Sequence, residues 1–441
     1  MDNTRYQSIA EKIAASIRSG KLAPGTQLPT VRALMHEHGV ALATAARVYK
    51  VLEETGLVVG ERGRGTFVRD MSVPRGDGLV QHPSAATMID LGFSYPALPG
   101  QEELLREGLR SLALSGDIDA LLHSAPQGGR PHQRETMARH LRNRGLRVPG
   151  GQVLIVNGAQ HGLSVTVSAL LQPGDVLAVD ALTYPGIKAV AQIHRLELAP
   201  LQLKNGSIDP DALGDLCKRR RIRAFYCMPT LHNPLGSVMS MAVRERVAKL
   251  AEDHGFLIIE DGAYAFLAEP APKPLQVLAP NRTIYVSGLS KSFASGLRVG
   301  FVVAPPSMVP ALEQAIRVSI WSTPSITVAL SCRWIESGVI DALEDKKRRD
   351  ASERQKLARK MLRHGVIVAH PSSYFLWLQL PDGLRADDVT RQLNEEGVLV
   401  TTAEPFSTLS HAPQALRLAL GSVPLQVLKE ALTKVNEAVS Y

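Results

Sequence analysis

Six short apolar runs between residues 153 and 304 constrain the fold of this chain more than any other feature. Patterns of helical length with polar faces separate most of these runs. The runs are VLIV at 153–156, VLAVD at 176–180, RAFYCM at 223–228, FLIIED at 256–261, TIYVS at 283–287 and VGFVVA at 299–304. Buried strands that alternate with helices indicate a parallel or mostly parallel sheet wrapped by helices. The sequence therefore predicts an α/β fold with a ligand at the carboxyl ends of the strands.

The bulk composition is that of a globular protein with more than one domain. The chain has 441 residues, of which 45% are hydrophobic and 21% charged, so two or three domains are expected. We expect no membrane span and no secretory signal, because no run of about eighteen apolar residues occurs and the N-terminus is polar. Cys217, Cys227 and Cys332 lack metal or disulfide spacing, which indicates reduced thiols. The net charge of +8 permits nucleic-acid binding.

Residues 1–70 form a unit of different character, which we call the reader. After a first helical pattern, Thr30 is expected to cap a short helix that Gly39 ends. A third helical pattern covers Ala41–Thr55. Residues 56–68, GLVVGERGRGTFV, contain two β-rich runs around a basic, glycine-rich tip, which is typical of a hairpin. Three helices followed by a basic hairpin predict a winged helix-turn-helix domain.

The reader resembles the GntR family of winged-helix repressors over residues 4–69. The run G-x-L-x-P-G-x-x-L-P-x-x-R and the wing G-R-G-T-F-V carry this resemblance. It implies that the helix of residues 41–53 enters the major groove and that the wing of residues 62–66 enters the neighbouring minor groove. The residues expected to contact DNA are Arg32, Thr44, Arg47, Lys50, Arg62, Gly63 and Arg64. For each arginine, a solvated protein surface is the alternative.

The recognition helix departs from the family at its start. The family usually has Ser-Arg or Ser-Asn there, whereas this chain has Ala41 and Leu42. The change removes a capping hydroxyl and one expected DNA contact, so the operator sequence cannot be transferred from relatives. Residues 1–70 carry ten Lys or Arg against seven Asp or Glu. We therefore expect salt-sensitive binding that depends on two readers per molecule.

Residues 71–88 are predicted to be a linker, because they contain Pro, Gly and Ser without sustained periodicity. A structured loop packed on the following domain is the alternative. The domain that follows covers residues 89–441, and its C-terminal part, about 310–441, is expected to form a smaller α+β subdomain. The charges of the basic helix at residues 341–360 are expected to form a solvated face.

The stretch YVSGLSKSFASGLRVG, residues 285–300, places one lysine directly after an apolar run. The amine of Lys291 can form a Schiff base with a carbonyl group. Arg298, seven positions later, can bind a phosphate through two parallel hydrogen bonds. An ordinary surface loop is the alternative for this stretch alone.

Polar groups also follow the other apolar runs. Gly158 lies in a turn that opens a helix, where free backbone N–H groups can bind a phosphate. Tyr184 lies at a turn where it can stack on a flat ring or cover the edge of the core, and Asn233 precedes a proline in a stiff turn. Asp261 ends an apolar strand and needs a partner such as a pyridinium nitrogen, with a helix cap as the alternative.

The order of these groups resembles that of the fold-type I aminotransferases over residues 89–441. A GntR-type reader joined to such a domain is the arrangement of the MocR group of bacterial transcription regulators. The resemblance implies that Lys291 forms the internal aldimine with pyridoxal 5'-phosphate and that Asp261 pairs with the pyridine nitrogen. It implies further that Asn233 and Tyr264 bond the ring hydroxyl and that Tyr184 stacks on the ring. The expected phosphate-binding residues are Gly158, Ala159, Gln160, Ser290 and Arg298.

The stretch QALRLAL, residues 414–420, fits the edge strand that presents an arginine to the substrate carboxylate in these relatives. Arg417 is therefore the candidate for binding an amino-acid effector, because a buried arginine needs an anion. An arginine turned outward from an alternating strand is the alternative. Two positions depart from the pattern of these relatives. Ser124 occupies the place of a tyrosine, and Gly288 occupies the place of a serine, while the nearest serine of this chain is Ser287. Both departures indicate a looser phosphate cup.

Two functions are compatible with these residues. The first is a transcription regulator whose pyridoxal phosphate domain senses an amine, an amino acid or a B6 vitamer and alters operator binding. The second is an active aminotransferase with a residual reader. The intact wing and the LPTVR segment favour the regulator, and the set of strand-end groups argues against a third alternative, a cofactor-free scaffold. We expect a homodimer in the bacterial cytoplasm, at the nucleoid when it is bound to operator DNA.

Overall fold

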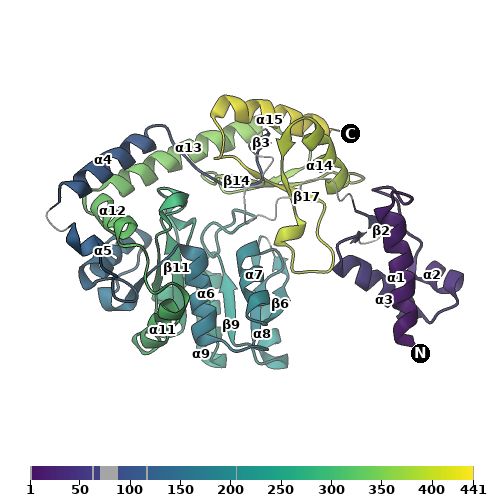
Figure 1. The fold of residues 1–441 in the computed structure, drawn as a ribbon, viewed down its shortest axis with the longest axis horizontal. Helices are drawn as coiled ribbons and strands as arrows, with labels where there is room; N and C mark the ends of the chain where they lie inside the picture. Colours follow the sequence, from purple (N-terminus) through teal and green to yellow (C-terminus); the bar gives the residue numbers. More distant parts are fainter. Residues whose placement is uncertain (1, 62–63, 70–87, 116–117, 205, 441) are drawn as a thin grey trace.

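The computed structural model describes residues 2–61, 64–69, 88–115, 118–204 and 206–440. Arg62 and Gly63, and residues 71–87 of the expected linker, lie outside these ranges. Figure 1 shows the reader at one end of the molecule and the rest of the chain, which we call the body, at the other. Within the described ranges, no helix combines the length and the apolar character needed to cross a membrane.

The reader contains three helices and a two-stranded hairpin around its own apolar core. Its elements are α1 (Asp2–Arg18), α2 (Val31–His38), α3 (Leu42–Glu54), β1 (Val58–Glu61) and β2 (Gly65–Val68). The Thr30 side chain accepts a hydrogen bond of 3.1 Å from the Ala33 N–H, and Gly39 ends α2 with a φ of 56°, as predicted. Ala41 makes no side-chain cap at α3, which is the consequence expected of the missing serine.

The body is built on a seven-stranded sheet in which every predicted apolar run forms a strand. Its strands, in spatial order, are β4 (Val153–Val156), β12 (Gly300–Val303), β11 (Thr283–Gly288), β10 (Leu257–Asp261), β9 (Ala224–Cys227), β5 (Val176–Asp180) and β6 (Glu197–Leu201). Only β12 is antiparallel to its neighbours. The edge strand β6 was not predicted, because its short sequence ELAPL begins with a glutamate and contains a proline.

Helices cover both faces of this sheet, so its strands are buried on two sides (Figure 1). One face packs against α6 (Ala159–Leu170), α7 (Pro185–Ile193) and α11 (Val309–Ile320). The other face packs against α5 (Pro131–Leu141), α8 (Pro210–Arg219), α9 (Met241–His254), α10 (Leu275–Leu278) and α12 (Ser325–Glu336). Helix α4 (Gln101–Ala113) lies next to α12.

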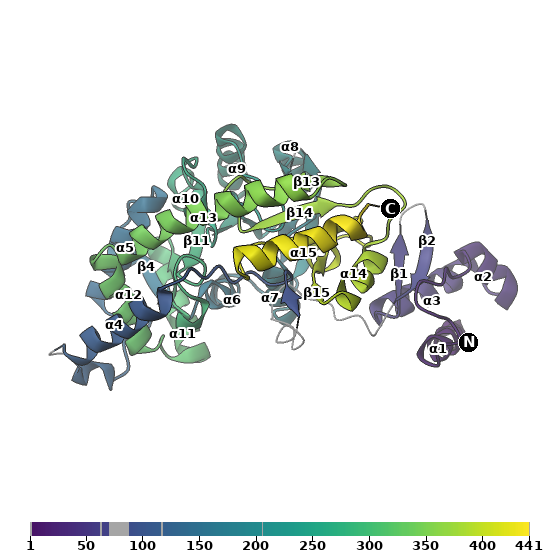
Figure 2. The same cartoon turned by 90° about the horizontal axis from the view of Figure 1, so that it is seen from above.

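A second, smaller sheet lies above the first and belongs to the C-terminal part of the chain. Its order is β13 (Val366–Val368), β14 (Phe375–Gln379), β17 (Ala415–Ala419) and β16 (Thr401–Thr402). The helices α13 (Val339–Met361), α14 (Ala386–Glu395) and α15 (Leu425–Ala438) share its core, and Figure 2 shows α13 beside α15. Strand β17 pairs on both sides, so the prediction of an edge strand for residues 414–420 is wrong.

Two short strands tie the start of the body to this second sheet. Residues 89–90 form β3 (Ile89–Asp90), which pairs in parallel with β15 (Val398–Leu399). Another small pair, β7 (Leu203–Lys204) and β8 (Ser207–Ile208), lies at the edge of the main sheet. We call the second sheet with α14, α15 and the C-terminal part of α13 the small subdomain.

Candidate functional site

A cavity of about 580 Å³ lies at the carboxyl ends of the main-sheet strands. The predicted residues that line it are Ala159, Gln160, Tyr184, Asn233, Asp261, Tyr264, Ser290, Lys291, Arg298 and Arg417. Gly158 is not part of the lining but immediately precedes α6, the helix that brings Ala159 to the cavity. A second cavity, of about 520 Å³, shares Asp261 as a wall but contains neither Lys291 nor Arg298. The structure thus gathers the candidate chemistry in the first cavity.

Lys291 is half-buried and points into this cavity from the segment after β11. Its Nζ donates a hydrogen bond of 2.7 Å to the Ser94 carbonyl and lies 5.2 Å from the centre of the Phe93 ring. Phe93, Ser94 and Tyr95 line one side of the cavity and were not predicted. Their aromatic pattern next to Pro96 was the available signal, but nothing local connects it to a lysine almost two hundred positions away.

Lys347 of α13 holds the backbone of Lys291 in place. Its side chain is fully buried, and its Nζ donates to the carbonyls of Pro96 at 2.7 Å, Lys291 at 3.0 Å and Phe293 at 3.0 Å. Burial, with repulsion from the Lys291 amine, lowers the pKa of Lys347 to about 7. The predicted solvated face is therefore wrong here, because the helix packs between the two parts of the body and buries Glu344, Lys347 and Arg354.

Asp261 ends β10 with its carboxylate buried against the cavity. Its Oδ2 accepts a hydrogen bond of 2.9 Å from the Tyr226 hydroxyl, and its Oδ1 accepts one of 2.9 Å from the Ala263 N–H. Burial raises the pKa of Asp261 to about 6, although both hydrogen bonds oppose the rise. Tyr226 was not predicted, because its role follows from the pairing of β9 with β10. The Ala263 contact is local to the turn and is not a helix cap, because the next helical turn, Ala265–Leu267, has Tyr264 as its N-cap.

Several buried polar atoms at the cavity have no hydrogen-bond partner within the described residues. They are Ser94 Oγ, Gln160 Oε1 and Asn233 Oδ1. Leaving such atoms unpaired is costly, so a bound polar ligand is a reasonable partner for them. Asn233 is 4% exposed and lines the same cavity as Tyr264, the other residue expected to bond a ring hydroxyl. The Asn233 amide oxygen can accept a hydrogen bond from the ring hydroxyl of pyridoxal phosphate, and the Ser94 hydroxyl can donate to one of its oxygens.

The turn between β4 and α6 forms a cradle with Arg298. The Arg298 guanidinium donates to the Asn157 carbonyl at 3.2 Å and lies 3.5 Å from Ser290 Oγ. A Cβ atom at Gly158 would lie 2.6 Å from Arg298 Nη2, and Gly158 has a φ of 84°, so only glycine fits this turn. The N-terminal N–H groups of α6, with Ser290 and Arg298, can bind a phosphate here.

The departure at Gly288 has a steric reason. A Cβ atom there would lie 2.9 Å from the Val299 carbonyl oxygen, so a serine would force the backbone to shift. The neighbouring Ser287 hydroxyl donates a hydrogen bond of 3.0 Å to the Gly262 carbonyl instead. The backbone at this position therefore requires glycine, and the serine hydroxyl is used at the neighbouring position.

Arg417 is 3% exposed and lines the cavity from β17, so the alternative of an outward-facing arginine is wrong. Its Nη1 donates to the Gly92 carbonyl at 3.0 Å, and its guanidinium lies 4.9 Å from the centre of the Phe375 ring. Its Nε has no hydrogen-bond partner within the described residues. Burial lowers the pKa of Arg417. A cation with an unused donor, held in an apolar setting, can bind a carboxylate.

The candidate DNA-binding residues occupy different positions in the reader. Arg32, Arg47 and Lys50 are exposed, whereas Thr44 is half-buried. The Arg47 guanidinium lies 4.4 Å from the centre of the Tyr6 ring of α1, so this side chain also braces the helices. Arg64 donates a hydrogen bond of 3.2 Å to the Gly383 carbonyl of the small subdomain.

Two family models match this chain, in the order predicted. Residues 86–435 match aminotransferase class I and II, and residues 5–68 match the bacterial regulatory proteins of the gntR family. The chain belongs to the class I and II aminotransferase family. Its gntR-family reader gives it the arrangement of the MocR group. The aminotransferase family implies pyridoxal 5'-phosphate as the cofactor, and the cavity has the donors and acceptors to hold it.

The proteins similar to this chain include both transcription regulators and aminotransferases. The uncharacterized HTH-type transcriptional regulator YdeF of Bacillus subtilis is 28% identical over 417 residues, which cover 94% of this chain and 90% of the relative. The HTH-type transcriptional regulator TauR of Rhodobacter capsulatus is 26% identical, with coverages of 98% and 96%. LysN, an α-aminoadipate aminotransferase of Thermus thermophilus, shares the fold of the body, with a TM-score of 0.74, 24% identity and coverages of 82% and 96%.

Proposed function

We propose that this protein is a DNA-binding transcription regulator whose cavity binds pyridoxal phosphate and senses an amine, an amino acid or a B6 vitamer. The observation that carries the proposal is a cavity lined by Lys291, Asp261 and Arg298 in the same chain as a winged helix-turn-helix reader. Relatives named as HTH-type transcriptional regulators match nearly the whole chain, which supports a regulator rather than an isolated enzyme domain.

Each residue at the cavity has a role in this proposal. Bound pyridoxal phosphate supplies an aldehyde carbon that can be linked to an amine. Lys291 would supply the amine that holds this carbon, an effector amine would compete with Lys291 for it, and Asp261 would balance the charge of the ring nitrogen. Asn233 and Tyr264 position the ring hydroxyl, and Tyr184 covers one face of the ring. Ala159, Gln160, Ser290 and Arg298 bind the phosphate, with Gly158 leaving the space for Arg298.

Arg417 indicates the chemistry of the effector. Its buried guanidinium lines the cavity that contains Lys291, so one small molecule can contact both. A molecule that carries an amine for the cofactor and a carboxylate for Arg417 is an amino acid. We therefore propose an amino acid as the effector class, with simple amines binding more weakly.

Active transamination is the second candidate. A 2-aminoadipate transaminase of Thermus thermophilus is 27% identical, with 82% of this chain and 91% of the relative covered. The residues at the cavity serve an enzyme as well as a sensor. Formation of a 2-oxo acid from an amino donor, without effect on DNA binding, favours this candidate.

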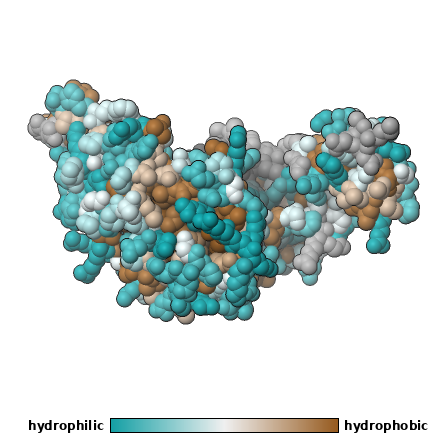
Figure 3. Space-filling view, turned by 90° about the horizontal axis from the view of Figure 1, so that it is seen from below, coloured by the Kyte–Doolittle hydropathy of each residue, from teal (hydrophilic) through white to brown (hydrophobic). Residues whose placement is uncertain are grey.

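We also propose that the protein is a homodimer in the cytoplasm, with a reader at residues 1–70, a linker at 71–88 and a body at 89–441. Large apolar side chains are exposed at α4, at the segment after it and near α11 and α12; they are Leu105, Leu109, Leu114, Ile118, Leu122, Val318, Trp321 and Ile326. Figure 3 shows a surface that is otherwise largely hydrophilic, with apolar side chains gathered on parts of the body. A second copy of the chain can bury such side chains.

The visible absorbance of the purified protein tests the cofactor and the effector together. We expect a near-visible band for the wild type with pyridoxal phosphate, and loss or alteration of that band in Lys291→Ala. Lys346→Ala, which removes an exposed lysine of α13, is the matched control and should keep the band. An amino acid that changes both the band and operator binding, without yielding a 2-oxo acid, supports the regulator. No band in the wild type contradicts the cofactor proposal.

A further inference from the structure

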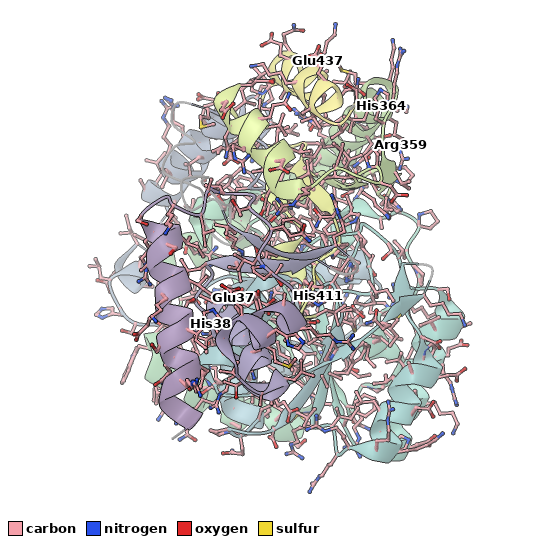
Figure 4. The ribbon with its side chains drawn as sticks, turned by 90° about the vertical axis from the view of Figure 1, so that its right-hand side faces the viewer. Glu37, His38, Arg359, His364, His411 and Glu437 are labelled. Carbon is pink, nitrogen blue, oxygen red and sulfur yellow. The ribbon has the colours of Figure 1, made fainter. Side chains whose placement is uncertain are left out.

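The wing of the reader is docked against the small subdomain. Gly60 and Arg64 each share a hydrogen bond with it: His411 Nδ1 donates to the Gly60 carbonyl at 2.9 Å, and Arg64 Nη2 donates to the Gly383 carbonyl at 3.2 Å. Further contacts are an ion pair between Arg69 and Glu404, and the Arg385 guanidinium over the Phe67 ring, 4.2 Å from its centre. Figure 4 labels His411 beside the helices of the reader. We call the described residues 58–61 and 64–69 the docked wing.

Docking occupies groups that the wing needs for DNA. Arg64 is expected to enter the minor groove, and its guanidinium cannot do so while it is bonded to the Gly383 carbonyl. The end of α3 lies at the same contact, because a Cβ atom at Gly60 would be 2.7 Å from both Glu53 Oε1 and the His411 ring. The described structure therefore withholds the wing from DNA.

One segment of the body contacts both the docked wing and the cofactor cavity. Within residues 403–411, Glu404 and His411 contact the reader, while Phe406 between them lines the cavity. We call these residues the coupling segment. Its preceding strand, β16, pairs Thr401 with Arg417, the proposed carboxylate ligand.

The coupling segment is also anchored to the turn that carries Tyr184. The Thr183 N–H donates to the Phe406 carbonyl at 2.8 Å, and the Thr408 N–H donates to the Ala181 carbonyl at 2.9 Å. Lys188 of α7 donates to the Pro405 carbonyl at 2.7 Å and to the carbonyl of Ser407. A ligand that shifts the backbone of the turn at Tyr184 must therefore move the coupling segment or break these hydrogen bonds.

We propose that the coupling segment links occupancy of the cofactor cavity to release of the docked wing for DNA. This inference rests on the proposed function and names the route by which that function is regulated. In one state the wing contacts the small subdomain, and in the other it contacts DNA. A ligand that binds one of these states more tightly therefore changes the affinity of the protein for DNA.

A reversible disulfide tests the docked state without any effector. A Cβ atom at Gly60 would lie 2.7 Å from the His411 ring, so cysteines at both positions face each other once the ring is removed. Binding is measured with a DNA duplex that the reduced wild-type protein has selected from a pool of random sequences. Oxidised Gly60→Cys/His411→Cys should bind it at least about tenfold more weakly than the reduced form, in line with the loss of wing contacts. Gly60→Cys alone, with the native Cys217, Cys227 and Cys332, controls for oxidation elsewhere.

Equal duplex affinity of the oxidised and reduced double variant overturns the inference, because a wing locked on the body would then not hinder binding. Mass spectrometry of the oxidised protein establishes that the intended disulfide has formed. This result does not depend on the cofactor, so it separates the inference from the proposed function.

A charge reversal tests the link to the cavity. Glu404→Lys places a positive charge against Arg69, and Glu197→Lys makes the same change at an exposed ion pair with Arg220 on the main sheet. The probe is aminooxyacetate, whose nitrogen replaces that of Lys291 on the cofactor carbon and frees the lysine amine. In the wild type and Glu197→Lys, the probe should change duplex affinity by about fivefold or more, the lower range of allosteric couplings.

Without aminooxyacetate, Glu404→Lys should bind the duplex more tightly than the wild type does. Adding aminooxyacetate should change its duplex affinity by less than about twofold, because the coupling between the two sites is lost. Its absorbance change with aminooxyacetate should match that of the wild type. A wild-type response in this variant overturns the inference. Absence of an absorbance change in the wild type instead overturns the proposed function, while the disulfide still decides whether docking controls the reader.

Discussion

At the residue scale, Asp261 and Tyr226 show how the cavity holds a charge ready for its cofactor. The two side chains lie on neighbouring strands, and a hydrogen bond of 2.9 Å joins them. Burial makes the carboxylate costly, and the Tyr226 hydroxyl and the Ala263 N–H reduce this cost only in part. We propose that a protonated ring nitrogen of the bound cofactor completes the compensation. The cofactor-free protein therefore carries an unfavourable charge that binding of pyridoxal phosphate relieves.

Asp261→Asn should stabilise the cofactor-free protein while weakening its cofactor binding. Burial raises the pKa of Asp261 from 3.8 to about 6, so the folded state binds this proton more tightly than the unfolded state. The corresponding stability is present at low pH and is lost as the pH rises from about 4 to about 6. At pH 7.5 the uncharged variant should gain about 1–3 kcal/mol, seen as a rise of the melting temperature by about 2 °C or more.

The matched control for this measurement is Asp345→Asn, which changes an exposed carboxylate of α13. It should leave both the melting temperature and the cofactor affinity near the wild-type values. A cofactor-free Asp261→Asn protein that melts below the wild type at pH 7.5 would contradict the account of a strained buried charge.

Tyr226→Phe should weaken pyridoxal phosphate binding, and more so at pH 6 than at pH 8. The hydroxyl lowers the pKa of Asp261, so its removal raises that pKa and leaves less carboxylate at pH 6. A hydrogen bond to a charged group contributes about 1.5–3 kcal/mol, which corresponds to a loss of about tenfold or more in affinity. Absorbance titrations with pyridoxal phosphate at pH 6 and pH 8 measure this affinity. Tyr285→Phe, on the neighbouring strand β11, should not show the pH-dependent loss.

At the element scale, the strands deliver their terminal residues to one edge, and the small subdomain closes the cavity from above. Strand β17 lies between β14 and β16, so the position of Arg417 is held on both sides. Helix α13 crosses from one part of the body to the other and fixes the Lys291 backbone through Lys347. Movement of the small subdomain would therefore shift Arg417 directly and Lys291 through helix α13.

Arg417→Met should discriminate between ligands with and without a carboxylate. The Gly92 carbonyl keeps a hydrogen bond of 3.0 Å from Thr401, so the substitution leaves no unpaired acceptor there. Loss of a buried charge pair costs about 2–5 kcal/mol, so aminooxyacetate should need a concentration at least about thirtyfold higher for half of its absorbance change. Methoxyamine, which has no carboxylate, is the matched ligand. An equal loss for both ligands would show that the variant has damaged the cavity itself.

At the scale of the whole molecule, the reader, the small subdomain and the proposed dimer surface lie in sequence along the protein (Figure 1). The docked wing contacts the small subdomain, whereas the exposed apolar side chains of α4 and α11 lie on the far part of the body. Regulation of DNA binding and assembly of two copies can therefore use different surfaces. Two readers on one dimer would bind an operator with two half-sites more tightly than one reader can.

A double variant tests the proposed dimer surface. Leu122→Glu/Trp321→Glu places charges at side chains that are 82% and 55% exposed, so the fold of a single chain should tolerate them. Charges within an apolar interface oppose association, so the variant should sediment as a monomer at micromolar concentration where the wild type is dimeric. Val366→Glu, at a 59% exposed position of the small subdomain, should leave the dimer intact. Identical sedimentation of all three proteins would contradict this surface.

Much of the fold and of the cavity could be predicted because the evidence is local. Each main-sheet strand except β6 lies within a largely apolar run, and α2 is delimited by the Thr30 side chain at its start and by the left-handed backbone of Gly39 at its end. The carboxyl ends of parallel strands meet at one edge, so groups that follow them converge even though their spacing in the chain is large. This rule predicts that Asp261 and Lys291 lie at the same edge of the sheet, and both residues line the same cavity.

The remaining features depend on which distant segments pack together. Tyr226 reaches Asp261 only because β9 and β10 pair in one register, and Lys347 is buried only because α13 crosses behind the Lys291 segment. The docked wing joins Arg69 to Glu404 across 335 positions of the chain. By itself, the sequence determined the α/β class, the reader and the groups that converge at the cavity, since local patterns encode them. The tertiary structure alone decided how these groups are held and how the reader is docked, since burial and long-range contacts have no local signature.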